Sequence, residues 1–238
     1  MSNYIVFAAS STIGQSIVAQ LKEEGHTVFQ TARNTEKIMP DAILDLTDFD
    51  AVNDCFSKAK LQMGKIDGVV NCSGSLLLKP AHLTNKMNYQ LTIDSSLTTS
   101  FAVVRGAGQY MTDGGSVVLI SSAAAMTGLA NHEAIAAAKA GIIGLAMSCA
   151  ATYAGQNLRF NVISPGLVET SLTQTITGNP TSRKFSESMH ALGHIGQADD
   201  IARAVCFLLD VKNNWITGQV LAVDGGLSRV QPKIKATA

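Results

Sequence analysis

The sequence Tyr4-Ile5-Val6-Phe7-Ala8-Ala9-Ser10-Ser11-Thr12-Ile13-Gly14 decides the fold, because an apolar run of strand length passes here directly into a helical pattern. Residues 4–8 form a short β-rich run, and residues 13–21 place their apolar side chains on one helical face. Gly25 ends this helix, and residues 27–31 again have strand character. The chain therefore opens with a strand, a helix and a second strand.

The same alternation continues along the chain. Further strands are predicted at residues 42–46, 66–71, 116–121, 160–164 and 219–223. The helices between them are predicted to begin near Asp48 and to span about 88–110, about 132–153 and 201–209, the last capped by Asp199-Asp200. Residues 170–197 have a weaker pattern and are predicted to form a lid-like insertion. The tail beyond Arg229 is polar and predicted to be loose.

Continuously apolar strands that alternate with helices predict a parallel sheet covered on both faces. With right-handed crossovers this gives a doubly wound α/β fold of about seven strands, and no linker divides residues 1–238 into separate domains. Ligands of such sheets bind beyond the carboxyl ends of the strands, where the strand order reverses. Functional residues are therefore expected just after the strands at 4–8, 66–71, 116–121 and 160–164.

Composition excludes several classes of protein. Hydrophobic residues make up 46% of the chain and charged residues 15%, which is enough apolar material for a core and too little charge for a disordered chain. Eighteen basic residues balance eighteen acidic ones, so no nucleic-acid partner is expected. The longest nearly apolar run, 140–154, falls short of the roughly 20 residues of a membrane helix, so no membrane is expected.

The four cysteines indicate a reducing compartment. Cys55, Cys72, Cys149 and Cys206 are widely spaced, with neither a C-x-x-C pair nor a histidine cluster beside them. A disulfide framework, a zinc site or any other metal centre is therefore not expected. The first residues carry no basic segment ahead of an apolar stretch, and hence no signal peptide is predicted. These features together favour a cytoplasmic protein.

The turn after the first strand has backbone N–H groups that could hold a pyrophosphate at the start of the helix. A dinucleotide site usually has several glycines here, whereas this chain has Gly14 alone. By itself this turn is equally well explained as a capped helix that follows a buried strand.

The ordered set of segments is more specific than any one of them. Along the chain follow Ser10-Ser11-Thr12-Ile13-Gly14, Asp45-Leu46, Asn71-Cys72-Ser73-Gly74, Ile120-Ser121-Ser122, Ala138-Lys139-Ala140-Gly141, Asn161-Val162-Ile163-Ser164-Pro165-Gly166, and Thr217-Gly218-Gln219 leading to Asp224-Gly225-Gly226. In this order and at these separations, the chain resembles a short-chain dehydrogenase/reductase over almost its entire length.

The resemblance implies a Rossmann-type sheet, a nicotinamide cofactor and hydride transfer to or from the carbonyl carbon of a small molecule. It assigns Ala8, Ser10, Ser11, Thr12, Ile13 and Gly14 to the pyrophosphate, Asp45 and Leu46 to the adenine, Asn71, Cys72, Ser73 and Gly74 to the adenosine ribose, and Pro165, Gly166, Val168 and Thr170 to the nicotinamide. The family's catalytic serine falls on Ser122. Its lysine falls on Lys139, which would bind the hydroxyls of the nicotinamide ribose.

Departures from the family pattern begin in the nucleotide-binding part. Ala8 and Thr12 replace two glycines and could crowd the pyrophosphate, although the Thr12 hydroxyl could instead bind a phosphate oxygen. The second strand ends in Gln30-Thr31-Ala32-Arg33, without the acid that NAD-selective members commonly carry. Arg33 could pair with a 2′-phosphate, so we expect NADP rather than NAD. A solvated loop cation is the alternative reading of Arg33.

The largest departure is catalytic. The family's proton-donating tyrosine lies four residues before the lysine, at a position occupied here by Ile135, and the helix asparagine of its proton relay falls on Ser96. Tyr153 lies on the other side of Lys139, about 20 Å along the helix. A positioned general acid contributes about 10²–10⁴ in rate, so ordinary carbonyl reduction would be slowed strongly.

His132 is the replacement acid to test, since residues 132, 135 or 136, and 139 fall along one helical face. The alternative is a surface histidine at the helix start. Lys139 lies in the apolar stretch 136–143 and needs polar partners if it is buried.

Two functions therefore remain open. One is an NADP-dependent oxidoreductase with an atypical proton donor, and the other is a non-catalytic dinucleotide sensor or scaffold subunit. Because the helix around Ile142, Ile143, Leu145 and Met147 is apolar on many faces, and family members often pair through it, a homodimer or homotetramer is expected. Residues 173–194 carry no pocket signature that indicates a particular substrate.

Overall fold

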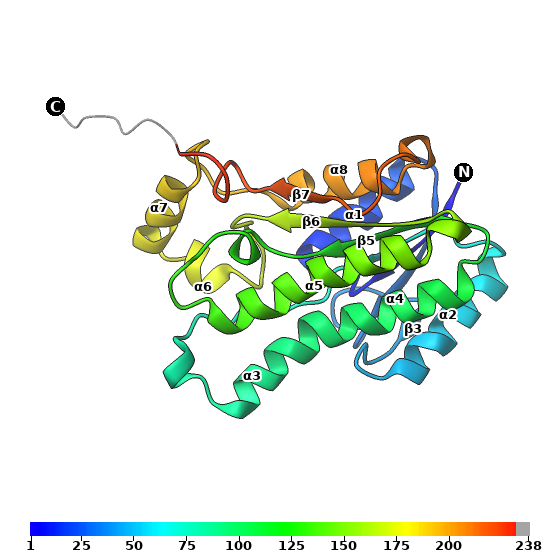
Figure 1. Cartoon of the computed structure of the whole chain (residues 1–238), viewed down its shortest axis with the longest axis horizontal. Helices are drawn as coiled ribbons and strands as arrows, with labels where there is room; N and C mark the ends of the chain where they lie inside the picture. Colours follow the sequence, from blue (N-terminus) through cyan, green and yellow to red (C-terminus); the bar gives the residue numbers. More distant parts are fainter. Residues whose placement is uncertain (232–238) are drawn as a thin grey trace.

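The computed structural model describes residues 1–231 and confirms a single doubly wound α/β domain (Figure 1). Seven parallel strands form one sheet in the order β3-β2-β1-β4-β5-β6-β7. The strands are β1 (Asn3–Phe7), β2 (Thr27–Ala32), β3 (Ala42–Ile43), β4 (Gly68–Asn71), β5 (Gly115–Ile120), β6 (Leu158–Pro165) and β7 (Val220–Val223). The tail that the sequence predicts to be loose lies outside the described residues, apart from Val230 and Gln231.

The helices lie between the strands in chain order. They are α1 (Thr12–Glu23), α2 (Phe49–Met63), α3 (Lys86–Ile93), α4 (Thr99–Tyr110), α5 (Glu133–Thr152), α6 (Gln174–Thr177), α7 (Pro180–Met189) and α8 (Ala198–Leu209). A π-helical turn, η2 (Asp94–Thr98), joins α3 to α4, and short 3₁₀ turns lie at η1 (Ala81–Leu83), η3 (Ala123–Ala125), η4 (Ala154–Gln156) and η5 (Val211–Asn213).

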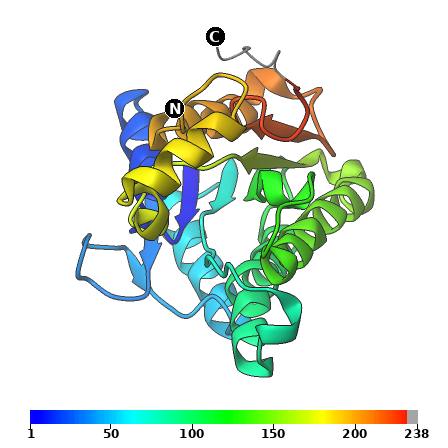
Figure 2. The ribbon, with the colours of Figure 1, turned by 90° about the vertical axis from the view of Figure 1, so that its left-hand side faces the viewer.

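Two helical layers enclose the sheet. Helices α1 and α8 pack against each other on one face, and α2, α4 and α5 cover the other (Figures 1 and 2). Side chains of β1 alternate between them, with Tyr4 and Val6 in the core beside α1 and Ile5 and Phe7 in the core beside α2. All four are buried, which is why this strand is apolar throughout its length.

Strand order reverses between β1 and β4. Strand β1 pairs with β2 on one side and with β4 on the other, and the register places Phe7 beside Asn71 and Asn71 beside Leu119. The segments that follow β1, β4 and β5 therefore leave the same edge of the sheet side by side. Figure 2 looks onto this edge, with α7 above the strand ends and α5 beside them. The candidate site lies here.

Three predicted boundaries were wrong for local reasons. The strand predicted at 42–46 is only two residues long, because the Asp45 carboxylate accepts hydrogen bonds from the Thr47 N–H (2.9 Å) and hydroxyl (2.8 Å) and forms a turn. Helix α8 begins at Ala198 after the N-cap Gln197. Asp200 lies within its first turn and takes part in the cap, because its carboxylate accepts from the Gln197 backbone N–H at 2.8 Å in a capping box; the predicted start at residue 201 was three residues late.

The long helix predicted at 88–110 is interrupted by the π-helical turn. Within and after this turn, the Thr99 hydroxyl donates to the Ser95 carbonyl at 3.2 Å and the Ser100 hydroxyl donates to the Ser96 carbonyl at 2.7 Å. Such bonds compete with the backbone ladder and bend helices. Asp48 and Gly25 lie at helix ends as predicted: Asp48 is the N-cap of α2, and Gly25, with a positive φ of 81°, follows α1.

Helix α5 alone among the described residues has the length and composition of a membrane-spanning helix. In the folded domain it lies against β6, α3 and the π-helical turn. A core helix of a soluble protein meets the same criterion, and 44% of the apolar window of α5 is buried in this domain.

Candidate active site

In the turn from β1 into α1, the backbone at Gly14 closely approaches the backbone of Ala8 and Ala9. Ser11 is the N-cap of α1 and its hydroxyl accepts from the Gly14 N–H at 3.1 Å. A Cβ at Gly14 would lie 2.7 Å from the Ala8 carbonyl oxygen and 2.9 Å from the Ala9 Cα, so only glycine fits there. The N–H groups of Thr12 and Ile13 open the helix without intrahelical partners. The turn thus has the form of an anion-binding helix start.

Ala8 has a left-handed backbone, with φ of 54°. This is the position at which the family pattern has its first glycine, and the structure explains why glycine suits it. An L-residue in this conformation costs about 1–2 kcal/mol. The replacement of glycine by alanine has therefore left the turn in its glycine-like form, under strain.

Thr12 joins the turn to the segment that follows β6. Its hydroxyl oxygen accepts from the Ser171 N–H at 3.3 Å and lies 3.4 Å from the Ser171 hydroxyl. Thr12, the second residue that replaces a family glycine, thus connects the turn after β1 to the segment after β6 within the expected cofactor site. Ser10 lies in the same turn, and its carbonyl accepts from the Gln15 side chain at 3.0 Å.

Arg33 and Asp45 lie on the adenine side of the site. Arg33 is exposed immediately after β2. The Asp45 carboxyl is exposed, and hydrogen bonds from Thr47, aided by the nearby Arg33 charge, lower its pKa. The neighbouring Leu46 is buried in the core beside α2. The structure therefore brings Arg33 near Asp45 and leaves the guanidinium accessible to an anion.

Hydroxyl groups surround the end of β4. The Asn71 side chain is buried, donates to the Ser100 hydroxyl at 3.3 Å, and accepts from the Ser73 N–H at 3.0 Å. The Ser73 and Thr99 hydroxyls lie 2.6 Å apart. This network holds residues 71–74 against the start of α4, in one fixed conformation.

Lys139 is the one charged side chain of α5 that is buried, with 6% of its surface exposed. Its Nζ donates to the Ile120 carbonyl oxygen at 2.8 Å, and a Cβ at Gly74 would lie only 3.2 Å from Nζ. Burial lowers the pKa of Lys139 from 10.5 to about 8. The same burial raises the pKa of the neighbouring Cys72 thiol to about 12, so Cys72 is protonated and inert. Lys139 thus lies at the junction of β4 and β5.

The predicted catalytic serine and the expected tyrosine position carry a hydroxyl and a hydrocarbon, respectively. Ser122 is the second residue after β5, and its hydroxyl oxygen accepts from the Ala124 N–H at 3.2 Å. Ile135, at the expected tyrosine position, is 4% exposed. His132 is the N-cap residue of α5, and its Nδ1 lies 2.8 Å from the Ala130 carbonyl oxygen. No hydrogen bond among the described residues joins His132 to Ser122 or Lys139.

The π-helical turn places Ser96 in the interior. Its side chain is fully buried and, within residues 1–231, its hydroxyl has no hydrogen-bond partner. A π turn at this point opens the helix next to α5, and such turns are frequent at functional sites. At the position where the family has its relay asparagine, this chain therefore has a buried polar side chain, and its hydroxyl binds no other described residue.

The segment after β6 is held more firmly than its sequence indicates. Val168 forms a β-bridge with Gly196, and the Thr170 N–H donates to the Thr173 hydroxyl at 3.1 Å. The Arg183 guanidinium of α7 binds both Glu169 carboxylate oxygens, at 2.8 and 3.1 Å. Residues 170–197, predicted as a lid-like insertion, thus contain two helices, of which α7 is bound to the segment predicted to contact the nicotinamide.

Sequence reasoning missed His190, which lies in this region. Its Nε2 accepts from the Leu167 N–H at 3.2 Å, and a Cβ at Gly166, next to Pro165, would lie 2.7 Å from the same nitrogen. No local motif marks His190, since the Leu167 N–H that its Nε2 accepts from lies 23 residues away in the sequence. The related signal in the sequence is the pair Gly225-Gly226, which adopts a positive φ at both positions in a turn near His190.

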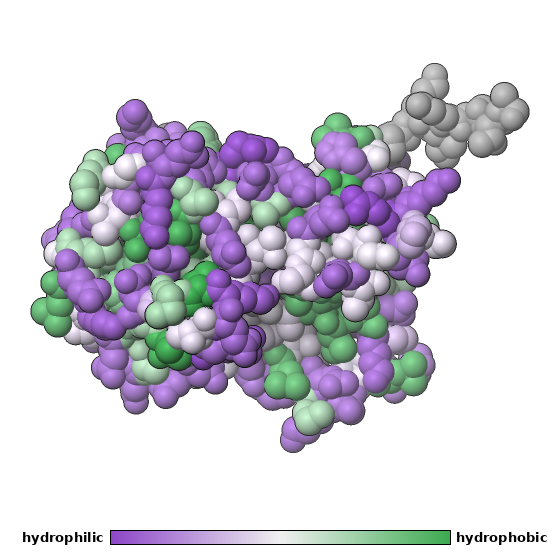
Figure 3. All heavy atoms as spheres, turned by 180° about the vertical axis from the view of Figure 1, so that it is seen from behind, coloured by the Kyte–Doolittle hydropathy of each residue, from purple (hydrophilic) through white to green (hydrophobic). Residues whose placement is uncertain are grey.

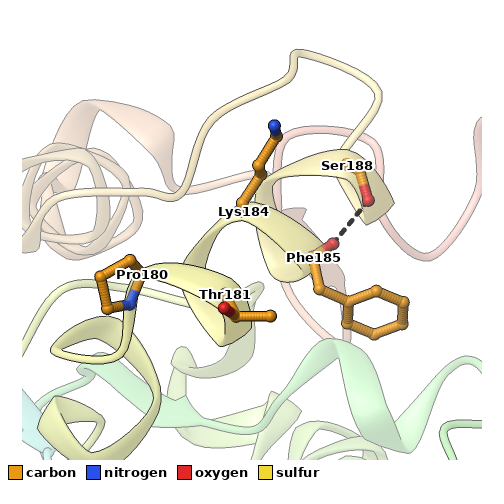
Figure 4. A pocket seen from close by; sticks show the side chains of 5 residues that line it. All are labelled: Pro180, Thr181, Lys184, Phe185 and Ser188. Atoms are coloured by element: carbon orange, nitrogen blue, oxygen red, sulfur yellow. Dashed lines mark hydrogen bonds between the residues drawn. The ribbon is translucent and has the colours of Figure 1, made fainter.

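Two open cavities border the same end of the molecule. One, of about 430 Å³, is lined by Pro180, Thr181, Lys184, Phe185 and Ser188 on one side of α7 (Figure 4). The other, of about 400 Å³, is lined by Ala191, Leu192 and the turn after β7 together with Val230. Neither contains Lys139 or Ser122, so these hollows are surface features beyond the expected hydride-transfer position.

The residues present fit a dinucleotide with altered contacts. A helix start with free N–H groups, a glycine beside the Lys139 amine and an exposed arginine after β2 match the pyrophosphate, ribose and 2′-phosphate of NADP. Ala8 keeps the glycine conformation, and the Thr12 hydroxyl contacts Ser171. The fold and these groups define a dinucleotide-binding doubly wound protein.

Comparison with known proteins places the chain within one family. The profile described as enoyl-(acyl carrier protein) reductase matches residues 7–228. The 3-oxoacyl-(acyl-carrier-protein) reductase FabG of Thermotoga maritima is 29% identical, over 94% of this chain and 96% of that protein. The chain belongs to the short-chain dehydrogenase/reductase family, whose members are NAD(P)-dependent oxidoreductases.

Other relatives bear on cofactor and activity. A short-chain type dehydrogenase/reductase from Mycobacterium ulcerans superposes with a TM-score of 0.92 at 26% identity, covering 97% of this chain and 91% of that chain. ElxO with NADP bound, and its tyrosine-to-phenylalanine variant with NADPH bound, each superpose with a TM-score of 0.89 at 25% identity, over 95% of this chain and 98% of theirs. A Xanthobacter autotrophicus protein named inactive 2-(S)-hydroxypropyl-CoM dehydrogenase 2 is 30% identical over 78% of this chain and 84% of that protein.

Proposed function

We propose that this protein is an NADP(H)-dependent oxidoreductase that acts on a small carbonyl or alcohol substrate with an atypical proton donor. The observation that carries the proposal is the buried Lys139 amine, which lies beside Gly74 at the ends of β4 and β5. A buried ammonium group needs polar partners, and the Ile120 carbonyl uses one of its three donors. When bound, the dinucleotide supplies the hydride. Lys139 is available to hold its ribose hydroxyls.

The cofactor-binding roles follow the order of the segments. Ala8, Ser10, Ser11, Thr12, Ile13 and Gly14 would bind the pyrophosphate, Arg33 the 2′-phosphate, Asp45 and Leu46 the adenine, Asn71, Cys72, Ser73 and Gly74 the adenosine ribose, and Pro165, Gly166, Val168 and Thr170 the nicotinamide. Arg33 can pair with the additional phosphate of NADP, and no acid at the end of β2 repels that phosphate. Both features favour NADP over NAD. The NADP-bound ElxO structures support the same choice.

Proton transfer is the altered part of the mechanism. Ser122 would orient the substrate oxygen, while the hydrocarbon at Ile135 can neither donate nor accept a proton. The proton would then come from His132 after its side chain leaves the Ala130 carbonyl, from water, or from the substrate. A lysine with a pKa of about 8 keeps a positive charge near the site at neutral pH and favours an oxyanion there.

The test is NADPH oxidation by purified protein with ketones, enones and 3-oxoacyl thioesters, since the matched family profile and FabG are named for acyl-carrier substrates. We expect turnover of at least one class, slowed by about 10²–10⁴ relative to a reductase with a positioned acid. NADPH binding without oxidation by any of these substrates would refute the enzymatic proposal.

A second candidate is a dinucleotide-binding protein without catalysis. It is favoured by the simultaneous changes at Ala8, Thr12, Ser96 and Ile135, and by the family relative whose name describes it as inactive. Calorimetric titration separates the two candidates. Tight NADP(H) binding without hydride transfer supports a sensor, and absence of binding supports a scaffold that acts through protein contacts.

We further propose a cytoplasmic homodimer or homotetramer that contacts its partner through α4 and α5. Phe101 of α4 and Met147 of α5 are 49% and 57% exposed. Both helices lie on the side of the sheet toward the viewer in Figure 1. On the opposite face, hydrophobic residues are dispersed among hydrophilic ones (Figure 3). Light scattering of the protein and of F101E should show two or four subunits and a shift to smaller species in the variant.

A further inference from the structure

His190, which follows α7 directly, has both ring nitrogens engaged. It is 4% exposed, its Nδ1 lies 2.7 Å from the Ser186 carbonyl oxygen, and its Nε2 lies 3.2 Å from the Leu167 backbone nitrogen. A neutral imidazole has one donor and one acceptor. Since Ser186 offers an acceptor and Leu167 a donor, the ring donates from Nδ1 and accepts at Nε2. The two backbone partners thereby select one tautomer.

The ring lies against the segment that follows β6. A Cβ at Gly166 would come 2.7 Å from His190 Nε2 and 3.0 Å from the Asp224 Cα, so the backbone passes between these two residues in direct contact. On the β7 side, a Cβ at Gly225 would lie 3.5 Å from the His190 Cβ. His190 therefore contacts three parts of the chain: α7, the segment after β6 and the turn after β7.

Other contacts hold the same segment, but they differ in exposure. The Leu167 carbonyl accepts from the Gly196 N–H at 2.9 Å, and Glu169 pairs with Arg183. The Glu169–Arg183 pair is partly solvent-exposed, and such pairs are screened by water and salt. The bond from Leu167 to the buried His190 ring is part-buried and lies at the start of the segment, where the backbone leaves β6. It is therefore well placed to set the direction in which this segment leaves the sheet.

We propose that His190 is a positioning residue of the hydride-transfer site. By accepting from the Leu167 N–H, it sets the path of the backbone from Gly166 to Thr170, against which the nicotinamide would lie. The inference rests on the proposed function for the identity of the ligand, but the contact itself belongs to the ligand-free protein. His190 does not touch the reacting atoms, and it acts through the backbone of this segment.

Two amide variants separate the two bonds of the ring. In H190Q, the side-chain oxygen reaches the place of Nε2 and can accept from Leu167. In H190N, the amide nitrogen matches Nδ1 and can donate to Ser186, but no acceptor reaches Leu167. The two variants are similar in polarity, so a difference between them reports on the Leu167 bond. Thermal melting of both proteins establishes that each is folded.

The first measurement is hydrogen exchange of residues 166–170 in the protein without ligand. Losing the hydrogen bond to the His190 ring is expected to accelerate exchange of the Leu167 amide about tenfold in H190N, with H190Q close to wild type. The second is calorimetric titration with NADPH, for which we expect about tenfold weaker binding in H190N only. With a reactive substrate, kcat should fall in H190N with a smaller change in the substrate KM.

Equal exchange in wild type, H190N and H190Q would overturn the inference, whatever the titration shows. Equal acceleration in both variants would also overturn it, because it would assign His190 a packing role without a specific contact to Leu167. Failure of the wild-type protein to bind NADPH would refute the proposed function instead. The exchange measurement does not depend on that result, so the two failures are distinguishable.

Discussion

Replacing Lys139 by methionine tests the burial of the charge on which the proposed site depends. The amine has a single hydrogen-bond partner among the described residues, the Ile120 carbonyl, and burial lowers its pKa from 10.5 to about 8. The unfolded chain therefore keeps this proton to higher pH than the folded chain does. It follows that the free energy of unfolding rises with pH between about 8 and 10.5.

The magnitude follows from the two pKa values. One pKa unit is worth about 1.4 kcal/mol, so the buried charge destabilises the fold by about 3 kcal/mol at neutral pH. About 2 kcal/mol of this is recovered between pH 8 and pH 10, as the folded protein loses its proton and the unfolded chain keeps most of its own. The K139M variant carries no charge at this position, so it lacks this pH dependence.

Urea-induced unfolding of both proteins from about pH 7.5 to 10 provides the measurement. Burial raises the pKa of Cys55, Cys72 and Cys206 to about 12, which lowers stability above about pH 9 in both proteins. The difference between wild type and K139M cancels most of this effect. The free energy of unfolding of K139M should exceed that of wild type, and we expect this difference to shrink by about 2 kcal/mol across the range. Parallel curves would show that the ammonium is solvated, and the reasoning would be wrong.

Three further changes test the other parts of the site. I135Y should raise carbonyl reduction by about 10²–10⁴ if the pocket is otherwise intact, and a folded variant without any gain would show that the geometry has also changed. A8G should relieve about 1–2 kcal/mol of strain and lose about 0.4–1 kcal/mol through the freer unfolded chain, which raises Tm by about 0–6 °C; a lower Tm contradicts the strain. R33S should weaken NADPH binding about 10–100-fold and leave NADH binding unchanged, and equal loss of both would remove Arg33 from the 2′-phosphate site.

The layering of the domain could be predicted because it follows from local patterns. Tyr4 to Phe7 is apolar at every position since both faces of β1 are covered, and the alternation of strands with helices then leads to a parallel sheet. The boundaries were less predictable where polar side chains bind their own backbone. Asp45 ends β3 early, and Ser95 and Ser96 accept hydroxyl bonds at the π-helical turn.

Part of the candidate site was also predictable from local sequence patterns. Lys139 was predicted from the resemblance to the family and from its apolar neighbours, and the structure places its amine at the ends of β4 and β5. The bond of Thr12 to Ser171 was not predictable, because the two residues are 159 positions apart and neither has a distinctive neighbourhood. The same holds for His190.

The amino-acid sequence alone determined the order of strands and helices, the edge of the sheet at which ligands would bind, and the presence of a hydrocarbon where the family has a phenol. These are properties of short segments, set by periodicity and residue type. Tertiary structure alone decided that Ala8 keeps a left-handed backbone and that His190 meets Leu167. Such contacts depend on how distant segments pack around the whole core, which no single segment specifies.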